Sequence, residues 1–138
     1  MPKIDLSRTL PHARIAELPN PYFGKVRDCY DRPDDTRLLI SSDRISAFDC
    51  IMPNGIPRKG EVLTQISHFW FERFASLVPN HLLAGANDPF GVPALADLPP
   101  AQLADIQRRS MLVKKARPLA IECIVRGVPP GLGEPVFD

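Results

Sequence analysis

Residues that could bind a phosphate group gather between Gly24 and Gly60 of this 138-residue chain. A glycine followed directly by a lysine, Gly24-Lys25, lets backbone amides approach a polyphosphate while the ammonium group balances its charge. Hydroxyls, a carboxylate and a guanidinium then follow an apolar strand-like run, in the segment Ser42-Asp43-Arg44-Ile45-Ser46. Groups at the end of a strand commonly point into a cleft. The mixture suits a phosphate-bearing substrate better than a solvated surface.

Each of these signals also has an ordinary structural interpretation. A Gly-Lys pair in a hairpin is more often a turn with a solvated charge, and the chain has neither a Walker P-loop nor a Gly-x-Gly-x-x-Gly fingerprint. Ser42 or Asp43 can act as a helix N-cap, which does not exclude ligand contact. Glu122 and Arg126 would share one face of a strand, where they either line a pocket or pair with residues across the sheet.

Composition indicates one domain and excludes several classes of function. Hydrophobic residues make up 44% of the chain, and 17 Lys+Arg against 16 Asp+Glu leave a formal net charge of +1, so we expect no nucleic-acid partner. The three cysteines show no Cys-x-x-Cys spacing, and no metal ligand is predicted from the residues themselves. Without a signal-like segment or a run of about 18 apolar residues, we expect a cytoplasmic protein with no membrane partner.

The elements that must position these residues follow an α+β pattern. Alternation from Lys25 to Asp31 and the run Thr36–Ser41 predict a hairpin about the turn-forming residues 31–35. Apolar residues between positions 59 and 78 recur at spacings of one, three or four, which predicts a long amphipathic helix with one apolar stripe facing the core. The stripe comprises Val62, Leu63, Ile66, Phe69, Trp70, Phe74, Leu77 and Val78.

The second half of the chain predicts shorter elements. We expect a short strand near residues 82–83, a helix over 101–108, and strands over 111–116 and 120–126 that flank a bend at Pro118. The fold class is therefore α+β, with a mostly antiparallel sheet and one long amphipathic helix.

Four ordered segments of the chain resemble the SAICAR synthetase family, the phosphoribosylaminoimidazole-succinocarboxamide synthases. They are residues 24–28 (GKVRD), 42–49 (SDRISAFD), 59–65 (KGEVLTQ) with Phe69-Trp70-Phe71, and 121–127 (IECIVRG). The resemblance runs from about residue 20 to residue 127. Four motifs in one order are far more specific than any one of them.

The resemblance implies an ATP-dependent ligase of purine biosynthesis. Such an enzyme joins L-aspartate to the carboxylate of carboxyaminoimidazole ribotide and yields SAICAR, ADP and phosphate, with ATP and Mg²⁺ as cofactors. It also implies the family's N-terminal ATP-binding domain, with a kinase-like nucleotide cleft, over residues 1–127. The expected small-molecule partners are the ribotide and aspartate, and the oligomeric state stays open.

The same resemblance assigns roles to individual residues. The backbone from Lys115 to Leu119 would hold the adenine edge, and Arg126 would meet the ribotide phosphate. The expected nucleotide-binding residues are Gly24, Lys25, Arg27, Lys115, Leu119 and Glu122. The expected substrate-binding residues are Ser46 and Arg126, and the catalytic candidates are Asp43 and Arg44.

The chain departs from the family pattern after Gly127. Residues 128–138 (VPPGLGEPVFD) read as a divergent tail, and the family's Asp-x-Lys-x-Glu-Phe-Gly signature, expected to supply magnesium ligands, is missing. We therefore expect a truncated chain of doubtful activity, marginally stable and prone to aggregation because apolar surface lacks cover. The alternative is a noncatalytic nucleotide-binding or interaction module.

Overall fold

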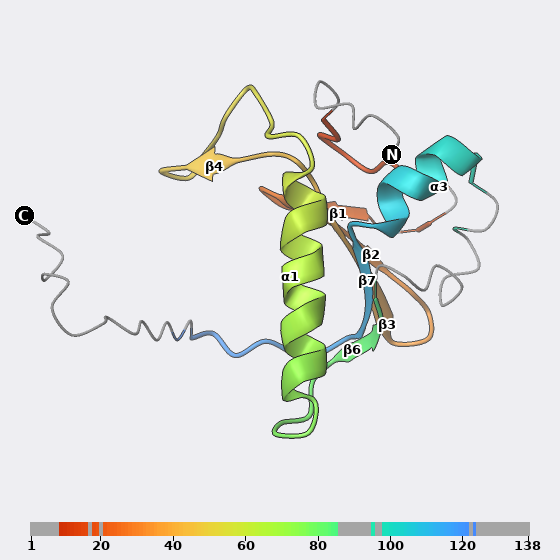
Figure 1. Cartoon of the computed structure of the whole chain (residues 1–138), viewed down its shortest axis with the longest axis vertical. Helices are drawn as coiled ribbons and strands as arrows, with labels where there is room; N and C mark the ends of the chain where they lie inside the picture. The colour runs from red at the N-terminus through yellow and green to blue at the C-terminus, as the bar shows by residue number, and fades with distance from the viewer. Residues whose placement is uncertain are drawn as a thin grey trace, which may run out of the picture.

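A five-stranded antiparallel sheet forms the centre of the fold (Figure 1). The computed structural model describes residues 9–16, 18–19, 21–85, 95, 98–121 and 123. The strands follow the order β1-β2-β3-β7-β6. Their bounds are β1 Pro21–Phe23, β2 Arg27–Asp31, β3 Thr36–Ser41, β6 Leu82–Ala84 and β7 Ser110–Lys114. The sheet confirms the predicted α+β class.

The hairpin of β2 and β3 forms as its sequence predicts. Cys29 pairs with Leu39 and Asp31 with Arg37, so each strand keeps the alternation read from the sequence. The turn closes through a 2.9 Å hydrogen bond from the Arg32 N–H to the Thr36 carbonyl, with Asp35 in the left-handed region at φ 57°. The short strand β1 was not predicted, because three residues are too few to show a period.

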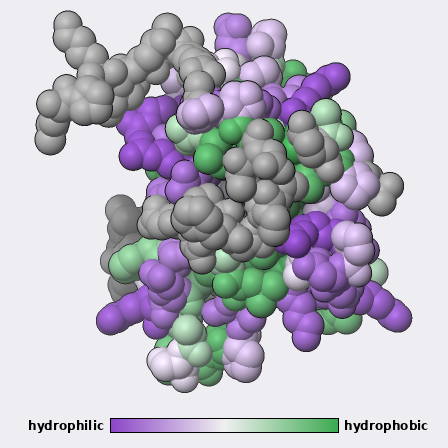
Figure 2. All heavy atoms as spheres, turned by 90° about the vertical axis from the view of Figure 1, so that its right-hand side faces the viewer, coloured by the Kyte–Doolittle hydropathy of each residue, from purple (hydrophilic) through white to green (hydrophobic). Residues whose placement is uncertain are grey.

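The hydrophobic core lies on one face of this sheet. Tyr30, Leu38, Ile40 and Leu112 point to that face and are buried. The helix α3 (Pro100–Gln107) packs there through Ile106. Further core residues come from the N-terminal segment and from the chain before α3: Ala13, Ile15, Leu18, Leu95 and Leu98. Figure 2 looks onto this side, where apolar residues gather toward the centre and hydrophilic residues toward the edges.

The long helix α1 (Lys59–Phe74) runs along the other side of the sheet from α3 (Figure 1). Its buried residues are Gly60 and Thr64, both small. The Thr64 hydroxyl lies 3.1 Å from Ser41 Oγ and 3.2 Å from the Arg109 carbonyl, so this narrow face contacts the end of β3.

The apolar stripe of α1 does not face the core. Phe69 and Trp70 are about half exposed, and Leu77, beyond the end of the helix, is 77% exposed. All residues of the predicted stripe are exposed: Val62, Leu63, Ile66, Phe69, Trp70, Phe74, Leu77 and Val78. The prediction that the stripe is core is wrong for this chain, because the helix meets the sheet through its small residues. Periodicity finds an apolar face but does not say what covers it.

A second, two-stranded sheet forms a hairpin that projects beyond the N-terminal end of α1 (Figure 1). It pairs β4 (Ser46–Ala47) with β5 (Cys50–Ile51). The two turn residues, Phe48 and Asp49, have φ of 47° and 63°. Two left-handed residues are typical of a type I′ hairpin turn, although neither is the usual glycine or asparagine. The sequence therefore gave no turn signal here.

The remaining predicted elements differ in outcome. The strand near residues 82–83, the helix over 101–108 and the strand over 111–116 are confirmed as β6, α3 and β7, with ends shifted by one or two residues. Ala120, Ile121 and Cys123 lie outside any strand, contrary to the strand predicted over 120–126, whose other residues fall outside the described ones. The predicted tail, 128–138, also lies outside them. Within the described ranges no helix is both long and apolar enough to cross a membrane.

Candidate functional site

Residues 24–26 connect β1 to β2. Together with Arg27, the first residue of β2, they form a turn that we call the nucleotide turn, because nucleotide contacts are expected there from the sequence. A 2.7 Å hydrogen bond from the Gly24 N–H to the Arg27 carbonyl closes it. Lys25 extends to the turn of the β4–β5 hairpin, where its Nζ lies 2.6 Å from Asp49 Oδ1. The ammonium holds the pKa of Asp49 below its usual value. Because the Lys25 side chain is 55% exposed, the turn presents a cation to solvent.

Arg44 binds the same turn from inside the protein. Its Nη2 donates to the Gly24 carbonyl at 2.7 Å, and its Nε donates to the Lys25 carbonyl at 2.8 Å. The guanidinium also forms an ion pair with Asp28, with 2.9 Å between Nη2 and Oδ1. Arg44 is 5% exposed and Asp28 is fully buried. The guanidinium therefore holds the turn carbonyls from the buried side of the turn.

Asp43, next to Arg44, joins three separate segments. Its Oδ1 accepts from the Gly60 N–H at 2.9 Å and from Arg109 Nη1 at 2.7 Å, and its Oδ2 accepts from the Leu10 N–H at 2.8 Å. Burial alone would raise the pKa of Asp43, but the bonds from Leu10, Gly60 and Arg109 together lower it. The carboxylate is buried, charged and fully engaged within the protein.

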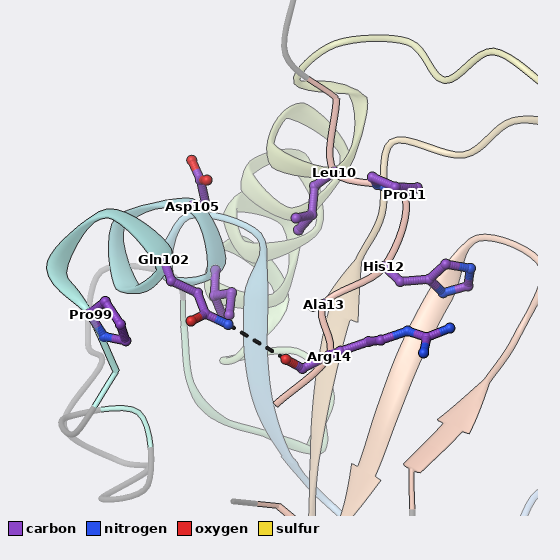
Figure 3. A pocket seen from close by; sticks show the side chains of 9 residues that line it. Leu10, Pro11, His12, Ala13, Arg14, Pro99, Gln102 and Asp105 are labelled. Atoms are coloured by element: carbon purple, nitrogen blue, oxygen red, sulfur yellow. Dashed lines mark hydrogen bonds between the residues drawn. The ribbon is translucent and has the colours of Figure 1, made fainter. Parts of the chain in front are cut away.

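A cavity of about 510 Å³ lies between the N-terminal segment and α3 (Figure 3). Gln102 reaches across it to the Arg14 carbonyl at 3.5 Å. The side chains of His12 and Arg14 point away from α3, so the cavity wall is largely apolar. A cavity with few polar groups fits a phosphate poorly, so the nucleotide turn remains the better candidate.

Lys115 lies at the opposite end of the sheet from Lys25. Thr36 pairs with Lys114 while Ser41 pairs with Arg27, so the two ends are separated by about 13 to 17 Å of strand. Lys115 Nζ lies 2.7 Å from Asp31 Oδ2. Hydrogen bonds from Arg37 and then from Lys115 lower the pKa of Asp31.

The structure brings some of the predicted site residues together and separates others. Gly24, Lys25 and Arg44 meet directly, and Arg27 begins β2 with its side chain exposed. Ser46 is half-buried in β4, and Leu119 is 86% exposed. Glu122 and Arg126 lie outside the described residues.

Three residues of the site had no individual signal in the sequence. Asp28 and Asp49 lie inside the motifs quoted above, but nothing there shows that they pair with Arg44 and Lys25. Arg109 follows α3 in the run Arg108-Arg109-Ser110, and nothing in that run marks it as a partner of Asp43. Only the packing of α3 and β7 against β3 places it on Asp43.

The described ranges contain no group of three or more His, Cys, Asp or Glu side chains arranged to hold a metal ion. The charged groups of the site form pairs instead, with each carboxylate facing an arginine, a lysine or backbone N–H groups. Such pairs can fix a loop and present a cation, but they do not themselves form a metal centre.

The fold is an α+β domain with a mostly antiparallel sheet, and comparisons with known proteins identify its family. The family model for SAICAR synthetase matches residues 20–135. The chain belongs to the SAICAR synthetase family.

Individual relatives agree with this assignment. The phosphoribosylaminoimidazole-succinocarboxamide synthase of Thermodesulfovibrio yellowstonii is 50% identical over 80% of this chain and 36% of the relative. That of Geotalea uraniireducens is 47% identical over 96% of this chain and 41% of the relative. The Saccharomyces cerevisiae SAICAR synthase, solved in complex with SAICAR, matches with a TM-score of 0.63 and 37% identity over 77% of this chain and 36% of that one. The chain spans between a third and a half of the length of these relatives.

Proposed function

We propose that this chain supplies the ATP-binding part of a SAICAR synthetase. The complete reaction would join L-aspartate to carboxyaminoimidazole ribotide, with ATP converted to ADP and phosphate. Residues 1–127 would form the ATP-binding domain and 128–138 a divergent tail. We further infer a cytoplasmic enzyme of purine biosynthesis that acts on small molecules, supported by the names of its relatives and by its near-neutral charge.

The observation that carries this proposal is the geometry of the nucleotide turn. The carbonyls of Gly24 and Lys25 face Arg44, while the Lys25 ammonium is half exposed. Among the described residues, that ammonium is held by one exposed carboxylate, Asp49. An exposed ion pair of this kind contributes little to stability, so Lys25 can exchange Asp49 for a phosphate at small cost. The turn therefore fits a polyphosphate anion.

The ends of the sheet suggest how the nucleotide would lie. The phosphates would meet the turn at Lys25, and the adenine would lie toward residues 115–119, with Glu122 near the ribose. When bound with ATP, Mg²⁺ would supply further positive charge near the phosphates, and no described residue is assigned to hold it. Arg126 and Ser46 would contact the ribotide, and Asp43 and Arg44 would shape the region where the substrates meet.

The chemistry requires activation of a carboxylate. An amine does not displace oxygen from a carboxylate at neutral pH, so a carboxylate oxygen of the ribotide first attacks the γ-phosphorus and ADP leaves. The neutral amine of aspartate then attacks the acyl carbon, the carbon–oxygen bond to phosphate breaks, the nitrogen loses a proton to solvent, and the amide forms. In this scheme Lys25 orients the phosphates and stabilises the negative charge that develops on them.

MgATP binding by the 138-residue chain tests this proposal. Isothermal titration calorimetry should detect binding to the wild type and about tenfold weaker binding to Lys25→Ala, the loss of about 1.4 kcal/mol. Arg73→Ala is the matched control, since Arg73 is an exposed cation in the last turn of α1. Equal affinity for wild type and Lys25→Ala would remove Lys25 from the phosphate role.

A second candidate is a noncatalytic nucleotide-binding or interaction module, favoured by the burial of the catalytic candidates Asp43 and Arg44 and by their bonds within the fold. Incubation with ribotide, aspartate and MgATP separates the two. SAICAR formation supports the ligase, whereas MgATP binding without product supports the module.

A further inference from the structure

The guanidinium of Arg44 is bonded to most of the carbonyl groups in the nucleotide turn. Besides Gly24 and Lys25, the carbonyl of Arg27 lies 3.5 Å from Nη2. The Gly24 N–H donates to the Arg27 carbonyl. The backbone N–H groups of Lys25 and Val26 make no hydrogen bond within the described part of the chain. With its carbonyls turned toward Arg44, the turn keeps amide donors available to an anion.

Arg44 is itself held in one orientation by groups on its other sides. Asp28, fully buried, accepts from Nη2. Nη1 donates to the Pro11 carbonyl and lies 2.6 Å from His12 Nδ1. The planar fork of the guanidinium has five N–H donors in fixed directions, which a lysine cannot reproduce with three donors on one atom.

The backbone and side chain of Lys25 are used in different ways. Its carbonyl is bound to a residue that is 5% exposed, whereas its own side chain is 55% exposed and reaches Asp49. Fixing the carbonyl limits the rotation of the backbone about Lys25, so it also limits the directions in which the ammonium can point.

We infer that Arg44 is the positioning residue of the nucleotide turn: it holds the turn's carbonyls so that the amides and the Lys25 ammonium can meet a nucleoside triphosphate. That the ligand is a nucleoside triphosphate rests on the proposed function. The hydrogen bonds from Arg44 to the turn are present in the structure without any ligand. Arg44 then acts through the turn, and its buried guanidinium does not touch the reacting atoms.

Hydrogen exchange and MgATP titration of Arg44→Lys test the inference. In Arg44→Lys, the N–H of Gly24 that closes the turn should exchange about tenfold faster than in the wild type, after correction for the change in global stability. The Kd for MgATP should rise about tenfold or more. The matched control is Arg109→Lys, a buried arginine that pairs with Asp43 and makes no bond to the turn. It should lose global stability but leave the corrected Gly24 exchange within about twofold of wild type.

Equal protection of Gly24 in wild type and Arg44→Lys would overturn the inference, and so would equal loosening by Arg109→Lys. If Arg44→Lys does not fold, the Arg44 Nε–H resonance of the wild type decides: slow exchange supports the bond to Lys25, and exchange at the rate of a free arginine refutes it. A wild type that protects Gly24 but does not bind MgATP would overturn the proposed function and leave Arg44 as the residue that fixes this turn.

Discussion

Arg109 and Asp43, which are 66 residues apart in the sequence, form a buried ion pair with 2.7 Å between Nη1 and Oδ1. Arg109 lies between α3 and β7, and Asp43 follows β3, so the pair connects the end of α3 to the end of β3. The same carboxylate also accepts the Gly60 N–H at the start of α1.

Asp43→Asn should lower the free energy of unfolding by about 3 to 5 kcal/mol, because Arg109 would be left as a buried charge without its counterion. Urea unfolding followed by circular dichroism measures this loss. Glu72→Gln on the exposed surface of α1 is the control and should change stability by less than about 0.5 kcal/mol. A loss at Asp43 as small as that of the control would show that the pair contributes little.

The ion pair should also make stability depend on acid pH. The folded pKa of Asp43 is lowered, so its contribution is present above the unfolded value of about 3.9 and is lost as the pH falls through the folded pKa. Wild type should therefore lose more stability between about pH 5 and pH 2 than Asp43→Asn does. Parallel pH profiles for the two proteins would contradict the lowered pKa.

Tyr30 fastens the N-terminal segment to the sheet. Its hydroxyl donates to the Ala13 carbonyl and accepts from the Ile15 N–H at 3.1 Å, in a buried setting. Tyr30→Phe should cost about 1 to 3 kcal/mol, because both backbone groups would lose a partner. The exposed Tyr22→Phe is the control, and thermal unfolding is the measurement.

Alkaline titration offers a second test of Tyr30. Burial, the largest influence, raises the pKa of Tyr30 above 10. Since the folded pKa is raised, this contribution to stability is full below the unfolded pKa and is lost as the pH rises through the folded one. Absorbance near 295 nm should show a tyrosine that ionises above the ordinary tyrosine pKa, and Tyr30→Phe should remove that transition. A transition that persists in Tyr30→Phe would refute the raised pKa of Tyr30.

Gly60 allows α1 to approach the end of β3. A Cβ at this position would lie 2.8 Å from the Ser41 carbonyl carbon and 2.9 Å from the Ser42 oxygen, which are rigid backbone atoms. Gly60→Ala should destabilise the protein by about 1 to 3 kcal/mol despite the better helix propensity of alanine. Ser67→Ala in the same helix is the control, and a stabilised Gly60→Ala would contradict the close packing.

The exposed stripe of α1 should govern solubility more than stability. Ile66 is 50% exposed, so Ile66→Gln should reduce light scattering at high concentration while changing the free energy of unfolding by less than about 1 kcal/mol. Leu38→Ala, in the core, should instead cost about 2 to 5 kcal/mol. A comparable loss for Ile66→Gln would show that the stripe is covered in solution.

The sequence by itself determined the elements with a strong local signal. The β2–β3 hairpin, α1 and α3 follow from period and turn chemistry, and the family follows from four ordered motifs, since both depend on residues close together in the chain. The β4–β5 hairpin was not predicted, because Phe48 is unusual in the left-handed region and no glycine follows it in the turn.

Tertiary structure decided which charges meet and which faces are buried. Three ion pairs join segments that only the sheet register brings together. They are Lys25 with Asp49, Arg44 with Asp28, and Arg109 with Asp43, and Arg44 also bonds the turn. The apolar stripe of α1 looks like core in the sequence, yet the helix meets the sheet through Gly60 and Thr64. A pattern gives the polarity of a surface, whereas burial and pairing depend on the three-dimensional neighbours of that surface.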